Sequence, residues 1–159
     1  MHLSMKCMIS DMTCPNVKKI HLIAETSDNL IIFGDCYHPE VIGIIGHCKG
    51  EVTVIPPVIS FLNYIKIDSK KNYVLVAQTT SSVEYFEIIK YYFKQYNNIK
   101  IIDTICKSTE KRQIEVAKLA EKCEYFVIVG GYKSSNTNKL FEIASQKCEA
   151  FHIENKNQL

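Results

Sequence analysis

Residues 30–43 read Leu30-Ile31-Ile32-Phe33-Gly34-Asp35-Cys36-Tyr37-His38-Pro39-Glu40-Val41-Ile42-Gly43 and decide the fold class. An apolar β-type run leads into a polar turn, and Pro39 then marks the start of a helix. The same order recurs after Tyr73–Ala77, Ile99–Ile102 and Tyr125–Val129. Strands that alternate with helices in this way are typical of right-handed crossovers and a mainly parallel sheet. The sequence therefore predicts an α/β fold whose polar turns gather at one sheet edge, where ligands bind.

The switch between apolar periods of two and 3.6 residues predicts the individual elements. Helices are expected at Pro15–Glu25, after Pro39, near Val58–Tyr64, and at Val83–Tyr96, Ser108–Lys122 and Ser135–Lys147. Strands are expected at Leu30–Phe33, Glu51–Ile55, Tyr73–Ala77, Ile99–Asp103, Tyr125–Gly130 and Ala150–Ile153. We expect the boundary between two lobes to lie between Asp103 and Ser108.

The composition indicates a globular chain and excludes some partners. Its 159 residues are 47% hydrophobic, and 19 Lys and Arg nearly balance 17 Asp and Glu, for a net charge of +2. This balance lacks the excess of positive charge that is typical of proteins that bind nucleic acid or an anionic membrane surface. We expect neither a leader peptide nor a membrane span, so a cytoplasmic location is the default. The seven cysteines are then expected to be reduced thiols or metal ligands, not disulfides.

Cys14 and Cys106 differ from the other cysteines because each stands directly before a predicted helix. Cys14 precedes Pro15, and Cys106 lies in a turn rich in helix-start residues. A thiol at such a position feels the positive end of the helix dipole, which lowers its pKa and favours the thiolate. Each alone would more often be a helix cap, but the repetition favours iron or zinc ligands. Cys123 and Cys148 are predicted to be small buried hydrophobes.

His38 and Glu40 occupy the turn before the helix at Pro39. Glu40 could simply complement the helix dipole, with His38 satisfying a loop carbonyl. Alternatively, the imidazole binds an anionic or hydroxyl group while the carboxylic acid passes a proton. A third hypothesis is a zinc site, in which the ligands would be Cys36, His38, His47 and Cys48. The spacing of these four residues is not a standard one.

Two hydroxyl-rich turns follow strands and open helices. In Gln78-Thr79-Thr80-Ser81-Ser82, Ser81 and Glu84 fit the S-x-x-E pattern of a capping box. The turn Gly130-Gly131-Tyr132-Lys133-Ser134-Ser135-Asn136 adds two glycines that allow close backbone approach. Ordinary turn chemistry explains either one. Two such turns at one sheet edge, each at a helix N-terminus, favour binding of a phosphate or diphosphate.

These segments resemble one known family. The residues that carry the resemblance are Thr13-Cys14-Pro15, His38-Pro39-Glu40-Val41 with Gly43, Gln78-Thr79-Thr80, Asp103-Thr104-Ile105-Cys106 with Arg112-Gln113, and Gly130-Gly131 with Ser134-Ser135-Asn136-Thr137. They occur in the order seen in 4-hydroxy-3-methylbut-2-enyl diphosphate reductases, from about Asp11 to Glu154. That family catalyses the last step of the methylerythritol phosphate route to isoprenoids. Its fold is a trefoil of three related α/β lobes around a 4Fe-4S cluster held by three cysteines.

The resemblance implies a role for each candidate residue. It makes Cys14 and Cys106 cluster ligands, Glu40 the catalytic proton donor, and His38 and Thr79 substrate contacts. Ser134, Ser135 and Asn136 would hold the diphosphate. The reaction would be reductive dehydroxylation of 4-hydroxy-3-methylbut-2-enyl diphosphate to isopentenyl or dimethylallyl diphosphate, with reduced ferredoxin or flavodoxin as the electron donor.

The resemblance also implies that the chain lacks part of the family's length. Residues 1–103 are expected to form the second lobe and residues 104–159 an incomplete third lobe. The first lobe, which carries the third cysteine ligand, is expected to be absent, and Cys7 lacks the glycine-rich surroundings of that ligand. We therefore expect the isolated chain to bind the cluster weakly and to need a separate first-lobe polypeptide. The alternative is a non-catalytic phosphate-binding or zinc-binding α/β module.

Overall fold

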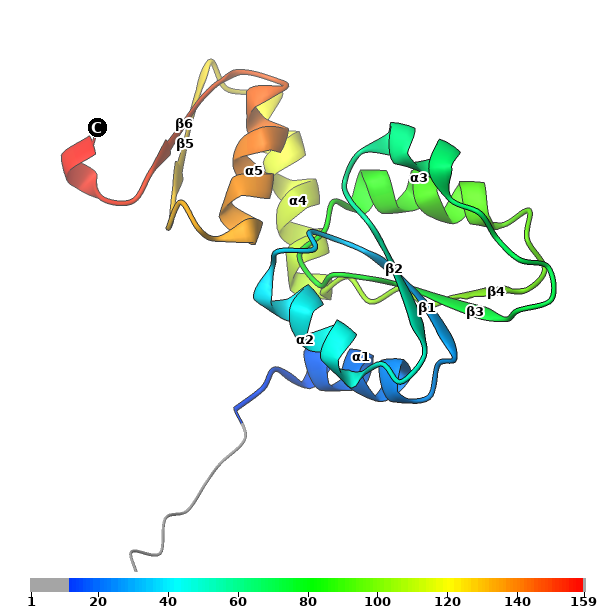
Figure 1. The fold of residues 1–159 in the computed structure, drawn as a ribbon. Helices are drawn as coiled ribbons and strands as arrows, with labels where there is room; N and C mark the ends of the chain where they lie inside the picture. The colour runs from blue at the N-terminus through cyan, green and yellow to red at the C-terminus, as the bar shows by residue number, and fades with distance from the viewer. Residues whose placement is uncertain (1–11, 159) are drawn as a thin grey trace, which may run out of the picture.

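A computed structural model describes residues 12–158 (Figure 1). The elements in chain order are α1 (Pro15–Glu25), β1 (Asn29–Phe33), α2 (Pro39–His47), β2 (Glu51–Ile55), the 3-10 helix η1 (Ile59–Tyr64), β3 (Tyr73–Ala77), α3 (Val83–Phe93), β4 (Ile99–Ile101), α4 (Lys107–Ala120), β5 (Tyr125–Val129), α5 (Ser135–Ser145), β6 (Glu149–Ile153) and η2 (Lys156–Gln158). Every predicted strand and helix is present, with ends that differ by a few residues. The predicted α/β fold class with parallel sheets is confirmed.

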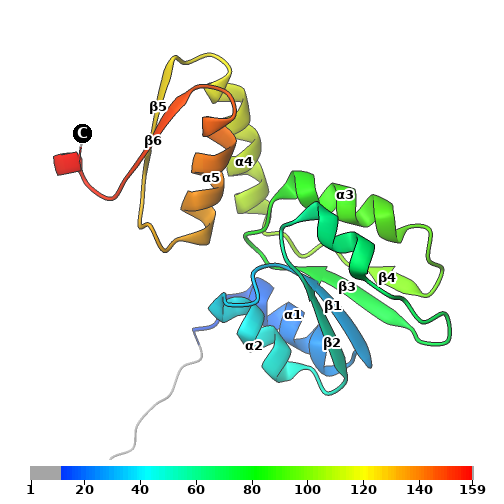
Figure 2. The same cartoon turned by 45° about the horizontal axis from the view of Figure 1, so that its top comes forward.

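The larger sheet is parallel and has the strand order β2-β1-β3-β4. All five residues of β1 are buried, as expected for a central strand of a parallel sheet covered on both faces. Helices α1 and α2 cover one face, and α3 with η1 covers the other (Figures 1 and 2). On the α3 side, the rings of Phe33 and Phe86 stack with centroids 5.8 Å apart. The carboxyl ends of β1 and β3, which are paired at Phe33 and Ala77, therefore lie side by side.

The smaller sheet consists of β5 and β6, which pair in parallel from Tyr125 to Val129. Helices α4 and α5 pack on one face of it (Figure 2). The core between them is small, with Ala120, Ile128 and Ala144 as its buried residues. On the other face, Tyr125, Val127, Val129 and Phe151 are exposed. This lobe therefore has an apolar sheet face without a covering helix in the part of the chain that the structure describes.

Two local predictions need correction. The N-cap of α3 is Ser82, whose hydroxyl accepts from Tyr85 N, so the predicted capping box at Ser81 is wrong. The Ser81 hydroxyl instead donates to Phe33 O at 3.3 Å, because β1 ends next to this turn. Cys123 is exposed, so the prediction that it is buried is wrong. Cys148 is half-buried and packs against the core of the small lobe, close to what the sequence predicts.

No helix between residues 12 and 158 has the length and apolar character needed to cross a membrane.

Candidate functional site

Glu40 and Thr79 form the centre of the site. Glu40 lies in the first turn of α2, and Thr79 lies in the turn between β3 and α3. Thr79 N donates to Glu40 Oε1 at 2.7 Å, and Thr79 Oγ1 donates to Glu40 Oε2 at 2.7 Å. Thr79 is only 7% exposed. The residues that follow these neighbouring strands thus hold a carboxylate by both of its oxygens. Glu40 is half-buried, and hydrogen bonds to a charged group are stronger than those between neutral groups.

His38 is the N-cap of α2 and lies beside this pair. Its Nδ1 accepts a hydrogen bond from Glu40 N at 3.2 Å. In the neutral imidazole one ring nitrogen accepts and the other carries the proton, so this contact assigns the proton to Nε2. The side chain is half-buried. His38 therefore caps the helix and retains an N–H donor for an anionic or hydroxyl group.

Cys106 is the N-cap of α4 and lies next to Thr79. Cys106 N donates to Thr79 O at 2.9 Å, and the Ser108 hydroxyl lies 3.0 Å from Cys106 Sγ. Hydrogen bonds from the Ser108 hydroxyl and then from the Ser108 and Thr109 backbone N–H groups lower the pKa of Cys106 to about 7, below the usual range of a thiol. The thiolate that iron and zinc require is therefore well populated near neutral pH.

Cys14 is the N-cap of α1, which brings a second thiol to the same region. Asn16, two residues further along, donates from Nδ2 to Cys106 Sγ at 3.5 Å. The first turns of α1 and α4 are thus in contact although 90 residues separate the two partners. The Cys106 sulfur is already contacted by Asn16 and Ser108, whereas Cys14 makes no side-chain cap hydrogen bond to α1 in the described chain. Both thiols thus stand at helix N-termini, where a negatively charged sulfur is stabilised.

The donor set fits part of an iron-sulfur ligand shell. Cysteine thiolates are the ligands of such clusters, and the lowered pKa of Cys106 and its contact with the first turn of α1 match that use. Among residues 12–158, no group of three or more His, Cys, Asp or Glu side chains converges on one point. Cys7 lies outside the described residues. The described chain thus presents thiols at the N-caps of two helices whose first turns are in contact.

Ser134, Ser135 and Asn136 open α5 at the neighbouring strand end of the small sheet. Ser134 caps the helix, with its Oγ accepting from Thr137 N at 3.3 Å and Thr137 Oγ1 at 2.9 Å. The Ser135 hydroxyl accepts from Thr80 Oγ1 at 3.0 Å and so joins the two lobes. Asn136 Oδ1 is buried without a hydrogen-bond partner in the described structure. A buried amide oxygen usually accepts a hydrogen bond, so a donor from water or from a ligand would satisfy this atom.

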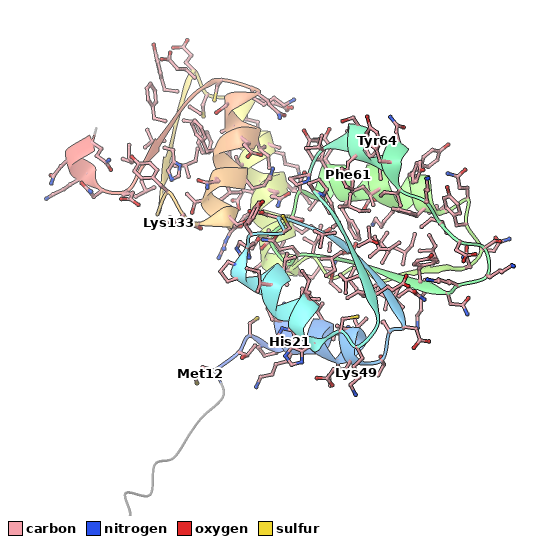
Figure 3. All side chains as sticks on the ribbon, in the orientation of Figure 1. Met12, His21, Lys49, Phe61, Tyr64 and Lys133 are labelled. Atoms are coloured by element: carbon pink, nitrogen blue, oxygen red, sulfur yellow. The ribbon has the colours of Figure 1, made fainter. Side chains whose placement is uncertain are left out.

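Two hollows flank these residues. One of 230 Å³ lies between the lobes and is lined by residues that include Gln78, Thr80, Ser135 and Lys133; Lys133 is labelled in Figure 3. The other, of 440 Å³, lies beside Cys106 and also contacts Asn16 and Lys107. His38, Glu40 and Asn136 line neither of these two hollows. The contacts described above, and not a single closed cavity, therefore define the site.

A third hollow, of 620 Å³, lies between η1 and α3. Its lining is mainly apolar and includes Ile59, Leu62 and Tyr91. Figure 3 shows Phe61 and Tyr64 on the same 3-10 helix. None of the predicted site residues contacts this hollow, so its size does not make it part of the site.

The predicted zinc site is wrong. Cys36 and His38 precede the nine-residue helix α2, whereas His47 and Cys48 end it, and a helix of that length rises about 13 Å. His47 instead stacks on His21 of α1, with ring centroids 4.0 Å apart, and contacts Glu25 at 2.8 Å. Cys48 Sγ donates to Ser27 O. These contacts turn both residues toward α1, away from His38.

The structure adds residues that the sequence reasoning did not assign to the site. Gln78 is 3% exposed, accepts from Asp35 N at 3.1 Å, and donates to Thr80 Oγ1 at 3.0 Å. Asn16 and Ser108 contact the Cys106 sulfur. Gln78 stands in one of the two hydroxyl-rich turns, so its position in the sequence indicates that it belongs to the site. Nothing in the sequence around Asn16 indicates its contact with Cys106.

Fold and site together define a class of α/β protein. In this class, cysteine thiols stand at the N-caps of helices, and a threonine binds a glutamate carboxylate at the ends of neighbouring strands. Helix N-termini rich in hydroxyl groups lie beside them. A family model described as "LytB protein" matches residues 2–159. The chain therefore belongs to the LytB family, in agreement with the resemblance found in the sequence.

The relatives it matches are named 4-hydroxy-3-methylbut-2-enyl diphosphate reductase. The protein of Clostridioides difficile (strain 630) is 38% identical over 97% of this chain and 57% of its own length. That of Sulfurimonas denitrificans is 39% identical over 95% of this chain and 56% of its own length. The chain thus spans little more than half the length of these curated relatives.

A solved structure gives the same family. The E-1-hydroxy-2-methyl-but-2-enyl-4-diphosphate reductase from Plasmodium falciparum superimposes with a TM-score of 0.83 and 26% sequence identity. The match covers 92% of this chain and 48% of that one. The arrangement of the two sheets is therefore one that a solved reductase also contains.

Proposed function

We propose that this chain forms part of a 4-hydroxy-3-methylbut-2-enyl diphosphate reductase. The reaction replaces the substrate hydroxyl with hydrogen, consumes two electrons and two protons, and releases water. The observation that carries the proposal is the Glu40 carboxylate, held by Thr79 N and Oγ1 at 2.7 Å beside the Cys106 backbone. This arrangement joins a proton-donating group to a thiolate of the kind that holds an iron-sulfur centre.

In this proposal Glu40 is the catalytic acid and Thr79 its contact to the substrate. Because Thr79 Oγ1 is within hydrogen-bond distance of Glu40 Oε2, a proton on that carboxyl oxygen can pass through the Thr79 hydroxyl to the departing substrate oxygen. The backbone N–H of Thr79 keeps Oε1 in place. A protonated carboxyl group held in this way acts as a general acid, and the proton transfer would convert hydroxide into water, the better leaving group.

The diphosphate is assigned to Ser134, Ser135 and Asn136, and His38 is assigned as a further substrate contact. His38 keeps its N–H at Nε2 because Nδ1 is occupied by Glu40 N. Ser134 and Ser135 accept hydrogen bonds from Thr137 and Thr80, which leaves their hydroxyl hydrogens for anionic oxygens. The N-terminus of α5 adds backbone donors and the positive end of its dipole. Together these groups would replace the water around the diphosphate charge.

Cys14 and Cys106 are assigned as two ligands of a 4Fe-4S cluster. When bound, such a cluster supplies electrons and an open iron position that acts as a Lewis acid toward the substrate hydroxyl. The residues of this chain would hold it with thiolates, stabilised at Cys106 by Ser108 and Asn16. Reduced ferredoxin or flavodoxin is the proposed electron donor, and the cytoplasm the proposed location. Residues 1–103 and 104–159 are proposed to be two lobes of a three-lobed trefoil.

The test is a dehydroxylation assay. The relatives are longer than this chain, so the chain is mixed with a polypeptide carrying the part of a relative that it does not match. After anaerobic reconstitution with iron and sulfide, the substrate and dithionite are added, and the products are quantified by mass spectrometry. Glu40→Gln should lower the rate by about 10²–10⁴-fold, whereas Glu115→Gln, on an exposed part of α4, should not. No product above that of either piece alone would contradict the proposal.

A further inference from the structure

In the part of the chain that the structure describes, strand β3 of the large sheet has no strand partner at its carboxyl end on one side. Strand β4 pairs with β3 from Tyr73 to Leu75 only, and Ile102 N then donates to Leu75 O at 2.9 Å. Beyond this point the chain leaves the ladder to reach α4. Ala77 is 0% exposed, so its backbone N–H and C=O on the β4 side need partners other than water.

One side chain satisfies both groups. Thr104 Oγ1 accepts from Ala77 N at 2.8 Å and donates to Ala77 O at 2.5 Å. A hydroxyl is suited to this task because it donates and accepts at once. Thr104 is itself 9% exposed, so water does not compete freely for these contacts. The hydroxyl thus takes the place that a further residue of β4 would occupy.

The contact between Thr104 and Ala77 matters for the site because the chain leads from each of these two residues directly into a site residue. Two residues after Ala77 comes Thr79, and two residues after Thr104 comes Cys106. Cys106 N donates to Thr79 O at 2.9 Å, and Thr79 holds the Glu40 carboxylate. The segment 104–106 therefore runs alongside 77–79 and is attached to it at both ends.

We propose that Thr104 is a positioning residue, whose hydroxyl fixes Cys106 beside Thr79 and Glu40 by replacing β4 at the end of β3. The inference rests on the proposed function in that it takes Cys106 and Glu40 as site residues. Thr104 is not in hydrogen-bond contact with the Cys106 sulfur in the described structure; it acts through the backbone of the turn. Loss of its hydroxyl frees the first attachment point and lets Cys106 move relative to Glu40.

The test compares Thr104→Val, which keeps the shape and removes the hydroxyl, with Thr104→Ser, which keeps the hydroxyl. Thr53→Val makes the same change on an exposed position of β2 and is the matched control. Amide hydrogen exchange, measured residue by residue by NMR, separates local opening from global unfolding. Thr104→Val should speed exchange at Cys106 N by about tenfold or more and leave the Ile31 and Ile32 amides of β1 unchanged. Thr104→Ser and Thr53→Val should match the parent chain.

A second readout uses iron. After anaerobic reconstitution, Thr104→Val should lose visible cluster absorption to a chelator about tenfold faster than the parent, and Thr104→Ser should restore the parent rate. If the valine variant does not fold, Thr104→Ala removes the hydroxyl without adding a methyl group in its place. Unchanged exchange at Cys106, equal acceleration at every amide, or a serine variant that behaves like valine would overturn the inference. A parent chain that takes up no cluster even when mixed with the unmatched part of a relative, while Cys106 exchange still responds to Thr104→Val, would refute the proposed function alone.

Discussion

Among residues 12–158, Thr79 supplies both hydrogen bonds to the Glu40 carboxylate. Thr79→Val should destabilise the fold by about 1.5–3 kcal/mol, the usual contribution of a hydrogen bond to a charged group. Urea unfolding monitored by circular dichroism measures this difference. In the proposed reductase the same variant should also lower turnover, because the proton would lose its path to the substrate.

The control for this prediction is Thr79→Ser, which keeps the hydroxyl. It should recover most of the turnover and most of the lost stability. Equal losses in the serine and valine variants would contradict the role given to the Thr79 hydroxyl, because serine retains that hydroxyl and valine does not.

Cys106 gives a prediction on pH. Because its pKa is lowered to about 7 and the thiolate is the nucleophile, alkylation of Cys106 should rise with pH and reach half its maximum rate near pH 7. Mass spectrometry of tryptic peptides after brief iodoacetamide treatment measures the rate. Ser108→Ala should move the midpoint upward, because it removes the largest cause of the shift.

The same shift makes stability depend on pH. The folded-state pKa lies below the unfolded value of about 8.5, so the unfolded chain binds more protons between these pH values. Folding stability should therefore rise from about pH 7 to about 8.5, and this gain should be lost as the pH falls through the folded-state pKa. In the alkylation experiment, a half-maximal rate near the usual pKa of a thiol, about 8.5, would contradict the role given to the Ser108 hydrogen bonds in lowering the pKa of Cys106.

Moving to the elements, the helix starts were largely predictable. Pro15 and Pro39 mark the starts of α1 and α2, because proline suits the first helical turn. The sequence predicts the N-cap of α3 at Ser81, one residue too early. Ser81 and Ser82 are both of a residue type that caps helices, but the Ser81 hydroxyl donates to Phe33 O at the end of β1, so Ser82 becomes the cap. A tertiary contact of this kind has no signature in the local pattern.

Alanine substitutions at Gly130 and Gly46 should have opposite effects on stability, because only Gly130 lies close to another element. A Cβ at Gly130 would lie 2.7 Å from Thr137 Oγ1 and 2.8 Å from Thr137 Cγ2, so Gly130→Ala should push the start of α5 away from β5 and destabilise by about 1–3 kcal/mol. A Cβ at Gly46, in α2, would meet nothing within 4 Å. Gly46→Ala should therefore stabilise by about 0.5 kcal/mol. Thermal unfolding measures both. A neutral Gly130→Ala would show that α5 does not approach β5 this closely.

For the whole molecule, the two lobes differ in how well they are covered. Strand β1 is buried along its whole length, whereas Tyr125 and Val129 of β5 are 64% and 65% exposed. Parallel sheets are normally covered on both faces, so the small lobe should open first. Hydrogen exchange with mass spectrometry should show faster exchange in β5 and β6 than in β1 and β3. Equal protection of both sheets would contradict this order.

The arrangement of the whole site was only partly predictable. The alternation of strands and helices indicates that Glu40 and Thr79 come after neighbouring parallel strands, so their meeting is a consequence of the topology. The approach of α1 to α4, seen in the Asn16 contact with Cys106, joins segments 90 residues apart and depends on how the lobes pack. Local sequence patterns carry no information on that packing, and the family resemblance was the only indication of it.

The central claim is that Cys14 and Cys106 hold one iron-sulfur cluster together. The most direct measurement is the visible absorption of the chain reconstituted anaerobically together with a polypeptide that carries the unmatched part of a relative, compared with the same mixture of Cys14→Ala, Cys106→Ala and, as control, Cys123→Ala at an exposed cysteine. We predict a broad cluster absorption in the parent and in Cys123→Ala that is lost in each of the other two variants. Full absorption in Cys14→Ala or Cys106→Ala, or none in the parent, would contradict the account.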